Sequence, residues 1–434
     1  MKKKTVGIIS LGCAKNQVDT EQMLFLLRQA GYTVVTEPAE AETLIVNTCG
    51  FIQPAKEESI DAIFEMASYK QAGSCKKLVV TGCLAQRYEK ALAEEMPEVD
   101  LFFGVNQYDR LVEALESPNP ARTCCAERFD FMESGRILTT PPYSAYVRIA
   151  DGCSNRCAYC AIPLIRGPFR SRDEEAIVRE VKTLAAQGVR EHTLIAQDTS
   201  RYGMDRGGES KLGDLMERLA GIPGVDWLRV LYCYPDETKL PLLEAMCRHD
   251  NICRYLDLPL QHIDPDMLRA MNRRGTPEDV KQLLKTAREM GFALRTTMIV
   301  GFPGETEDQF KRLYDFVGET RFDRLGAFAY SPEEDTPGAE MPGQIPEEVK
   351  QERLDKLMTL QRGISRARNE ERIGTVEKVL ITSVREDGTC TGRSAWESPE
   401  SDGEIIFTGS GEEGKFTAVR ITGADDYDLE GEQL

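Results

Sequence analysis

Three cysteines within eight residues constrain this chain more than any other feature of its sequence. Cys153, Cys157 and Cys160 are spaced C-x3-C-x2-C, and Gly152 before them lets the backbone turn tightly. Iron–sulfur clusters are usually held by four cysteine thiolates, so three would leave one iron free to bind a small molecule. A zinc site would need a fourth Cys or His at short spacing, and the next histidine is His192. We therefore expect an iron–sulfur cluster here.

The composition narrows the class of protein. Thirteen cysteines, an odd number, in a chain without a recognisable secretory signal favour metal ligation in a reducing compartment over disulfides. No apolar run reaches the length of a membrane span, so we expect a cytoplasmic protein. The chain has 54 Lys and Arg against 72 Asp and Glu, a net charge of −18. Such a charge fits a basic protein partner better than a nucleic acid.

Residues 4–120 alternate between short β-rich runs and helical patterns. This alternation predicts an open α/β domain with parallel strands joined by helical crossovers. Strands are expected over Val6–Leu11, Thr43–Thr48, Lys77–Thr81 and Asp100–Phe103, and helices over Asp19–Ala30, Pro54–Tyr69 and Ala85–Glu95.

Three further cysteines fall at the carboxyl ends of expected strands in this domain. Cys13, Cys49 and Cys83 each follow a strand, precede a helix and have a glycine neighbour. Because the carboxyl ends of parallel strands share one edge of a sheet, the three side chains are expected to converge. The alternative is coincidental burial of unrelated thiols. The arrangement favours a second site with three thiolates.

Residues 121–142 show little periodicity and are expected to be a linker. Residues 143–370 then form a second alternation of strands and helices. Six strands separated by helices predict a partial TIM-type (β/α)6 barrel, with its chemistry at the carboxyl ends of the strands. A long amphipathic helix over Ile345–Ile373 is expected to pack along it. The strands are expected near Ala145–Ala150, Thr193–Ala196, Leu228–Tyr232, Leu256–Leu260, Ala293–Val300 and Leu325–Tyr330.

Polar residues at those strand ends are candidates for binding a ligand. Gln197 and Asp198 follow the second strand of the barrel, and His262 follows the fourth. Glu305 follows the fifth strand, after a Gly-rich turn that lacks the lysine of a phosphate loop. The alternative for His262 is a structural role in the core. The alternative for Glu305 is that it only stabilises the start of the next helix.

Three arginines follow the cysteine run closely. Arg166, Arg170 and Arg172 lie in the segment IPLIRGPFRSR. One interpretation is a solvated basic face. The other is that arginine beside a negatively charged cluster offsets its charge.

Residues 371–434 have a different pattern, in which short β-rich runs are separated by Gly-rich turns. This pattern predicts a small OB-like barrel. Over residues 375–434 there are 14 Asp and Glu against 5 Lys and Arg, a balance of −9. Such a charge repels phosphate and attracts a basic protein. The terminal run Asp425–Glu432 is expected to be a solubilising acidic face. Strands are expected over Val376–Val384, Thr389–Arg393, Glu404–Phe407 and Phe416–Thr422.

The motifs LGCAKN, NTCGF, TGCLAQ, C-x3-C-x2-C, IPLIRGPFRSR and GFPGET, in this order, resemble the methylthiotransferase family of radical S-adenosylmethionine (SAM) enzymes. The resemblance spans essentially the whole chain and implies an N-terminal methylthiotransferase domain, a radical SAM core and a C-terminal TRAM domain. AQDTSRYG, YLDLPLQHID and TGRSAWESPESDG resemble the members that modify an aspartate of a small-subunit ribosomal protein. Ala14 stands where those members commonly have proline, which should alter local rigidity more than ligation.

The resemblance implies two 4Fe-4S clusters and SAM as cofactors. One cluster would cleave SAM to a radical, and the auxiliary cluster would present the sulfur that becomes a methylthio group on the aspartate β-carbon. Gln197, Asp198 and Arg295 would contact SAM, and flavodoxin or ferredoxin would donate electrons. The implied ligands are Cys153, Cys157 and Cys160 for the first cluster and Cys13, Cys49 and Cys83 for the auxiliary cluster.

Two other functions remain open at this point. A tRNA (N6-isopentenyladenosine) methylthiotransferase would share all six cysteine ligands, but the acidic C-terminal barrel argues against RNA. A non-catalytic electron carrier with two clusters would have no use for a barrel large enough to hold SAM.

Overall fold

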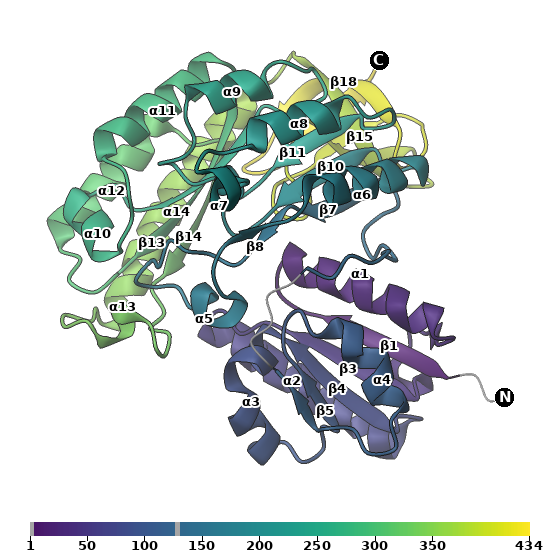
Figure 1. Ribbon diagram of the computed structural model, residues 1–434. Helices are drawn as coiled ribbons and strands as arrows, with labels where there is room; N and C mark the ends of the chain where they lie inside the picture. The colour runs from purple at the N-terminus through teal and green to yellow at the C-terminus, as the bar shows by residue number, and fades with distance from the viewer. Residues whose placement is uncertain (1–3, 126–130) are drawn as a thin grey trace.

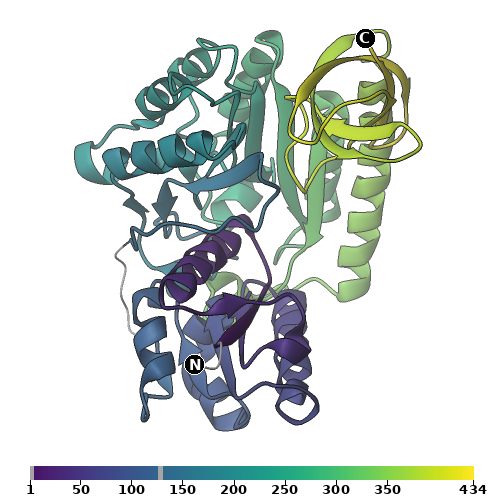
Figure 2. The ribbon, with the colours of Figure 1, turned by 90° about the vertical axis from the view of Figure 1, so that its right-hand side faces the viewer.

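The computed structural model describes residues 4–125 and 131–434, so residues 126–130 of the expected linker lie outside the described residues. In chain order the described residues form a parallel α/β domain, a partial barrel of β/α units and a small closed β-barrel (Figure 1). Figure 2 shows the closed barrel beside the central strands and the N-terminal domain at the opposite end. The fold class expected from the sequence is confirmed. Across the described ranges, the helices are all too short or too polar to cross a membrane.

The N-terminal domain is a six-stranded parallel sheet in the order β2-β1-β3-β4-β5-β6. Two edge strands, β2 and β6, were not expected from the sequence, and β6 uses the first residues of the expected linker. The strands are β1 (Thr5–Ser10), β2 (Thr33–Val34), β3 (Thr43–Thr48), β4 (Lys77–Gly82), β5 (Leu101–Phe103) and β6 (Thr123–Cys124). The helices are α1 (Ala14–Gln29), α2 (Gln53–Ala72), α3 (Cys83–Glu95) and α4 (Leu111–Glu116).

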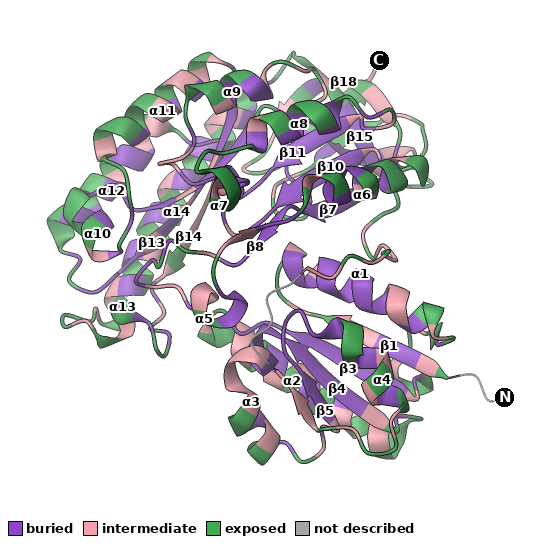
Figure 3. Ribbon diagram, viewed as in Figure 1, coloured by how far each residue is buried: buried purple, intermediate pink, exposed green. Residues whose placement is uncertain are grey.

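The central strands of this sheet are covered on both faces, as Figure 3 shows. Every residue of β3 is buried. Leu44 and Val46 pack with the side chains of α2 and α3, whereas Ile45 between them packs with those of α1 and α4. Because successive side chains of a strand point to opposite faces, a continuous apolar run is what a strand covered on both faces requires.

The central domain has six parallel strands in two runs, β7-β10-β11 and β12-β13-β14. A parallel bridge between Leu228 and Ile252 joins the runs, so the partial (β/α)6 barrel is confirmed. A two-stranded ribbon, β8 (Ala150–Asp151) with β9 (Arg170–Ser171), encloses the cysteine loop. The strands are β7 (Ser144–Arg148), β10 (Glu191–Ile195), β11 (Trp227–Val230), β12 (Tyr255–Gln261), β13 (Ala293–Val300) and β14 (Arg324–Ala329).

Helices cover the outside of these strands and pack into one core. The long helix α14 (Glu347–Glu370) packs along β14, as expected, and contributes Leu357 and Ile364 to this core. The other helices are α5 (Ile162–Arg166), α6 (Glu174–Ala186), α7 (Met204–Gly207), α8 (Leu212–Ala220), α9 (Leu240–Met246), α10 (Pro265–Ala270), α11 (Pro277–Glu289), α12 (Glu307–Thr320) and α13 (Pro337–Glu340).

The C-terminal barrel closes with five strands in the order β15-β16-β17-β19-β18. The sequence predicted four of them and assigned the last stretch to an acidic solvated face. That assignment was incomplete, because Leu429 and Gly431 are buried whereas Glu430 and Glu432 are exposed. The strands are β15 (Val376–Val384), β16 (Thr389–Arg393), β17 (Ile405–Thr408), β18 (Phe416–Ala424) and β19 (Leu429–Gln433).

A buried ion pair joins this barrel to the central one. Arg393 of β16 donates two hydrogen bonds to the carboxylate of Glu191 in β10, at 3.1 and 2.7 Å, and Arg229 of β11 donates a third at 3.2 Å. Burial alone would raise the pKa of Glu191, but Arg393 and Arg229 outweigh it and lower the pKa to about 2. The pairing therefore stabilises the seam fully at neutral pH and is lost only as the pH falls toward 2.

We expect Arg393→Ala to lower the free energy of unfolding, because Glu191 would keep a buried charge after losing its bidentate partner. Removing one partner of a buried pair costs about 3–5 kcal/mol. Both tryptophans of the chain, Trp227 and Trp396, pack in the apolar cluster of the same seam. Tryptophan fluorescence during a urea titration therefore measures the loss directly.

Arg385→Ala is the matched control, since Arg385 lies exposed in the same barrel. Its transition should stay close to that of the unmodified chain, as for most surface substitutions. An equal shift in both variants would show that the buried pair does not hold the seam.

Candidate metal centres

The three strand-end cysteines of the N-terminal domain lie on neighbouring strands. Cys13 precedes α1 after β1, Cys49 follows β3, and Cys83 opens α3 directly after β4. Because β1, β3 and β4 are adjacent and parallel, their carboxyl ends form one stretch of the sheet edge. The structure thus brings the three loops together, as the sequence predicted.

Two glycines allow these loops to approach one another. Gly12 has a φ of +92°, and a Cβ there would lie 3.1 Å from the sulfur of Cys49. Gly82 has a φ of +96°, and a Cβ there would lie 2.5 Å from the carbonyl oxygen of Thr48. A side chain at either position would push the cysteine loops apart. The glycines that adjoin Cys13 and Cys83 in the sequence are therefore required by the packing of the loops against one another.

Asn16 ties the same three loops together from α1. Its side-chain amide nitrogen donates to the carbonyl oxygens of Leu11 and Thr48, at 2.9 and 3.0 Å, just before Cys13 and Cys49. Its oxygen lies 3.6 Å from the sulfur of Cys83. The asparagine is the last residue of the LGCAKN motif, and its role could not be inferred without the fold.

The thiols at this site are held away from water to different degrees. Cys49 and Cys83 are buried, and Cys13 is exposed. Burial raises the pKa of Cys83 to about 12, although Arg166 opposes this effect. Thiolates are the form that binds metal, so a metal charge is what would drive ligation at so buried a position.

The second group of three cysteines lies in the loop between β8 and α5, after the first barrel strand, as expected. The amide of Cys153 donates to the carbonyl oxygen of Gly167 at 3.1 Å, which closes the loop at its base. The sulfur of Cys157 lies 3.2 Å from the hydroxyl of Tyr234, which follows β11. Arg273, which follows α10, places a guanidinium nitrogen 3.9 Å from the same sulfur.

Burial also raises the pKa of two thiols in this loop, to about 11 for Cys153 and about 12 for Cys160. Within residues 4–125 and 131–434, no three His, Cys, Asp or Glu side chains are gathered closely enough to hold a single metal ion. A cluster of several irons binds each thiolate through a different iron, so its ligands lie farther apart than those of one ion. Three thiols in each group are the donor set that a cluster with one open iron would use.

Gln197 and Asp198 lie beside the cysteine loop. Gln197 donates to Asp151 at 2.9 Å, and its buried side-chain oxygen has no hydrogen-bond partner among the described residues. Asp198 accepts a hydrogen bond at 2.8 Å from Asn155, which lies within the cysteine run, and another from Arg201 at 3.1 Å. Asp198 therefore fixes the loop, while Gln197 keeps an acceptor free.

Arg295 lies elsewhere, near the amino end of β13. It donates to Asp257 at 2.9 Å and lies 3.8 Å from Asp402 of the C-terminal barrel. Arg295 and Asp402 border a cavity of about 330 Å³ at the seam with that barrel. These surroundings favour a role at the seam, and contact with SAM stays a prediction.

The other residues singled out from the sequence have structural partners. His262 accepts a hydrogen bond from the amide of Asp264 at 2.9 Å, so its other ring nitrogen donates to Glu305 at 3.1 Å. Arg172 pairs with Glu180 and Glu133. Arg166 is buried, so it does not belong to a solvated face, and its guanidinium points to the N-terminal site.

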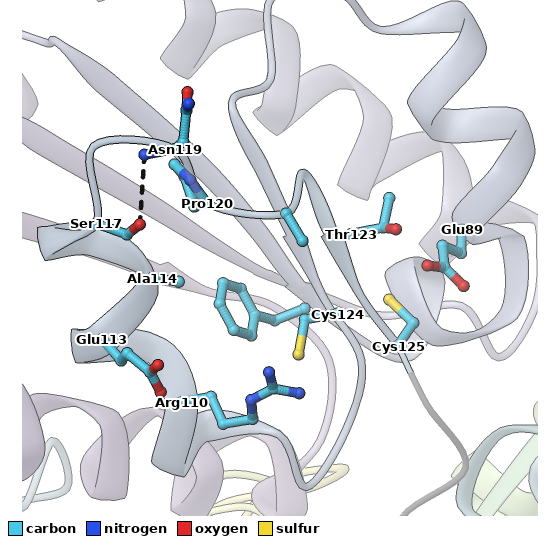
Figure 4. A pocket seen from close by; sticks show the side chains of 12 residues that line it. Glu89, Arg110, Glu113, Ala114, Ser117, Asn119, Pro120, Thr123, Cys124 and Cys125 are labelled. Carbon is cyan, nitrogen blue, oxygen red and sulfur yellow. Dashed lines mark hydrogen bonds between the residues drawn. The ribbon is translucent and has the colours of Figure 1, made fainter.

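Two hollows open on the N-terminal domain. One, of about 550 Å³, includes Cys13 and is bordered by Thr139 and by Glu400 of the C-terminal barrel. The other, of about 580 Å³, includes Cys124 and Cys125 (Figure 4). These two thiols belong to the cores on opposite faces of the sheet, so they do not form a joint site.

Comparison with known proteins covers all three parts of the chain. Residues 5–104 match the family described as Uncharacterized protein family UPF0004, residues 147–317 the Radical SAM superfamily and residues 373–434 the TRAM domain. In solved structures, the chain is similar to the radical SAM methyltransferase TsrM of Kitasatospora setae, with a TM-score of 0.56 and 15% identity over 75% of this chain and 73% of that one. At that identity the likeness shows the fold alone.

Curated relatives match over the whole length. Proteins named ribosomal protein uS12 methylthiotransferase RimO are 51% identical in Desulforamulus reducens, over 99% of both chains, and 50% identical in Heliobacterium modesticaldum, over 99% of this chain and 95% of that one. The protein of that name in Geobacter sulfurreducens is 47% identical, over 99% of this chain and 98% of that one. With identity this high over both full lengths, the chain belongs to the RimO family of radical SAM methylthiotransferases.

Proposed function

We propose that this chain adds a methylthio group to the β-carbon of an aspartate in the small-subunit ribosomal protein uS12. The observation that carries the proposal is the pairing of two three-cysteine groups across one buried seam, in a chain of the RimO family. Arg166, six residues after Cys160, reaches to within 3.9 Å of the sulfur of Cys83. A carrier of electrons alone would not need a β/α barrel beside one of the two groups.

We assign Cys153, Cys157 and Cys160 as ligands of a 4Fe-4S cluster that also binds SAM. Three thiolates would leave one iron of such a cluster without a protein ligand, and SAM would bind there. With one electron from the donor, the cluster and SAM would supply the radical that removes hydrogen from an unactivated C–H bond. The chain itself positions this chemistry. Asp198 fixes the loop through Asn155, and the free oxygen of Gln197 is an acceptor for a group of SAM.

We assign Cys13, Cys49 and Cys83 as ligands of an auxiliary 4Fe-4S cluster, which would supply the sulfur. The donor set fits, because three thiols from adjacent strand ends again leave one iron without a protein ligand. The exposed Cys13 borders an opening, through which a protein substrate would reach this site. The domain boundaries that go with these roles are 4–120, 121–142, 143–370 and 371–434.

The acidic C-terminal barrel is proposed to bind the basic ribosomal protein. Glu400 of this barrel lies at the opening beside Cys13, and Tyr146 donates to its carboxylate at 3.1 Å. An acidic group at that rim attracts a basic segment and repels the phosphates of tRNA. Flavodoxin or ferredoxin is the proposed electron donor.

Cysteine replacements should separate the two sites. After anaerobic reconstitution with iron and sulfide, Cys153→Ala should neither cleave SAM nor modify uS12. Cys13→Ala should cleave SAM with reductant but leave uS12 unmodified. Cys247→Ala, at the half-buried end of α9, should retain both activities. Mass analysis of the nucleoside products and of uS12 measures both.

The same reactions run with tRNA test the alternative substrate. A methylthio group on tRNA and none on uS12 would replace the proposal by the tRNA reaction. SAM cleavage without either product would overturn the substrate assignment. Loss of SAM cleavage in Cys13→Ala would overturn the separate roles of the two sites.

Glu400→Gln should raise the KM for uS12 severalfold and change kcat little, because it removes one charge from the rim and leaves both cysteine groups intact. Added salt should raise the KM of the unmodified chain more than that of the variant, since screening acts on exposed charges. Steady-state kinetics with purified uS12 at two salt concentrations measure this effect.

Glu386→Gln removes a charge that is also exposed, from the turn after β15, and is the control. If it raises the KM as much as Glu400→Gln does, the barrel acts by its total charge and not through the rim.

A further inference from the structure

Arg166 is a buried cation that links the two cysteine groups. It ends α5, only 1% of its surface is exposed, and α5 lies against α3 of the N-terminal domain (Figure 1). One guanidinium nitrogen lies 3.3 Å from both oxygens of Asp151, which precedes the loop with Cys153. The other lies 2.9 Å from Asp19, 2.9 Å from the oxygen of Asn16 and 3.9 Å from the sulfur of Cys83.

We propose that Arg166 is a positioning residue of the auxiliary site, which holds Asn16 and Cys83 in place for the cluster and stabilises the more negative, reduced state of that cluster. This inference rests on the proposed assignment of Cys13, Cys49 and Cys83. It assigns a residue of the SAM-binding loop region to the other cluster.

Arg166 orients the side-chain amide of Asn16. Asn16 spans the loops of Cys13 and Cys49 through its nitrogen, so its oxygen is left to face Arg166 and Cys83. A hydrogen bond from Arg166 fixes which way this amide points. Partners that orient ligands in this manner affect metal affinity in other proteins by about 10–100-fold.

Arg166 also places a positive charge beside the sulfur of Cys83. Arg166 and Arg148 face the carboxylates of Asp19 and Asp151, so the four charges cancel when seen from a distance. Close to the sulfur of Cys83 they do not cancel, because Arg166 contacts that sulfur directly. A positive group beside a cluster ligand stabilises the state with one more electron and therefore raises the reduction potential.

The structure also provides a matched control in Arg148. It is 3% exposed, lies 2.6 Å from Asp19 and 3.9 Å from Asp151, and its third partner is Gln22 at 3.2 Å. Its loss removes the same charge from the same network without removing a contact to a cysteine. Arg148→Gln therefore reports the cost of disturbing the network alone.

The test uses the full-length chain with Cys153, Cys157 and Cys160 replaced by alanine, so that only the auxiliary site is loaded. Iron and sulfide content, the midpoint potential and the rate of iron loss to a chelator are measured anaerobically. Arg166→Gln should lower the potential and lose iron severalfold faster. Arg166→Lys, which keeps the charge, should restore part of the potential, and Arg148→Gln should leave the potential near that of the parent.

An unchanged potential in Arg166→Gln, or an equal fall in Arg148→Gln, overturns the inference. If Arg166→Gln does not fold, Arg166→Lys provides the test. A variant with the same midpoint potential and the same iron retention as the parent would contradict a positioning role. Failure of the parent to bind iron and sulfide would instead reject the assignment of Cys13, Cys49 and Cys83. The two proposals therefore fail in distinguishable ways.

Discussion

Four buried charges at the seam between the N-terminal sheet and the central barrel determine how the two halves meet. Arg148 and Arg166 of the barrel face Asp19 of α1 and Asp151 of β8, and none of the four is more than slightly exposed. Taking such charges out of water is costly, and their attraction offsets the cost only when every partner is in place. The seam is thus far more selective for one orientation than an apolar contact of the same size. The distance between the two cysteine groups follows from that orientation.

The same chemistry holds the third part of the chain. Glu191 of the central barrel forms ion pairs with Arg229 and Arg393. Glu397 of the C-terminal barrel forms ion pairs with Arg324 and Arg372. Among the described residues, the buried side chains include eleven Lys or Arg and eleven Asp or Glu, so the interior is neutral. The net charge of −18 is therefore carried by the other side chains. The acidic balance of the sequence is a property of the surface, which is where a basic partner would meet it.

Most strands and both cysteine groups could be predicted because their signals lie in short stretches of the sequence. Apolar runs between helical patterns predict parallel strands, and cysteines at the ends of such strands converge wherever the strands are neighbours. The misses were elements that depend on contacts distant in the sequence. Edge strands β2 and β6 have two residues each. β19 alternates Leu429 and Gly431 with glutamates, and only the barrel that it closes shows that pattern to be a strand.

The direction in which a side chain points could not be predicted from the sequence either. The run IPLIRGPFRSR places Arg166 near the loop cysteines, yet Gly167, with a φ of +72°, ends α5 at a point that leaves Arg166 facing the N-terminal domain. Ala161 and Ile165 pack against Cys83 and Val105 on the same side. The helix that follows one cysteine group thus forms part of the wall of the other. An opening that includes Cys13, Thr139 of the connecting segment and Glu400 of the C-terminal barrel is bordered by parts of the chain that are distant in sequence. Under the proposed function, a substrate segment that entered there would meet Cys13 and Glu400 together, so recognition and sulfur transfer would be confined to one place.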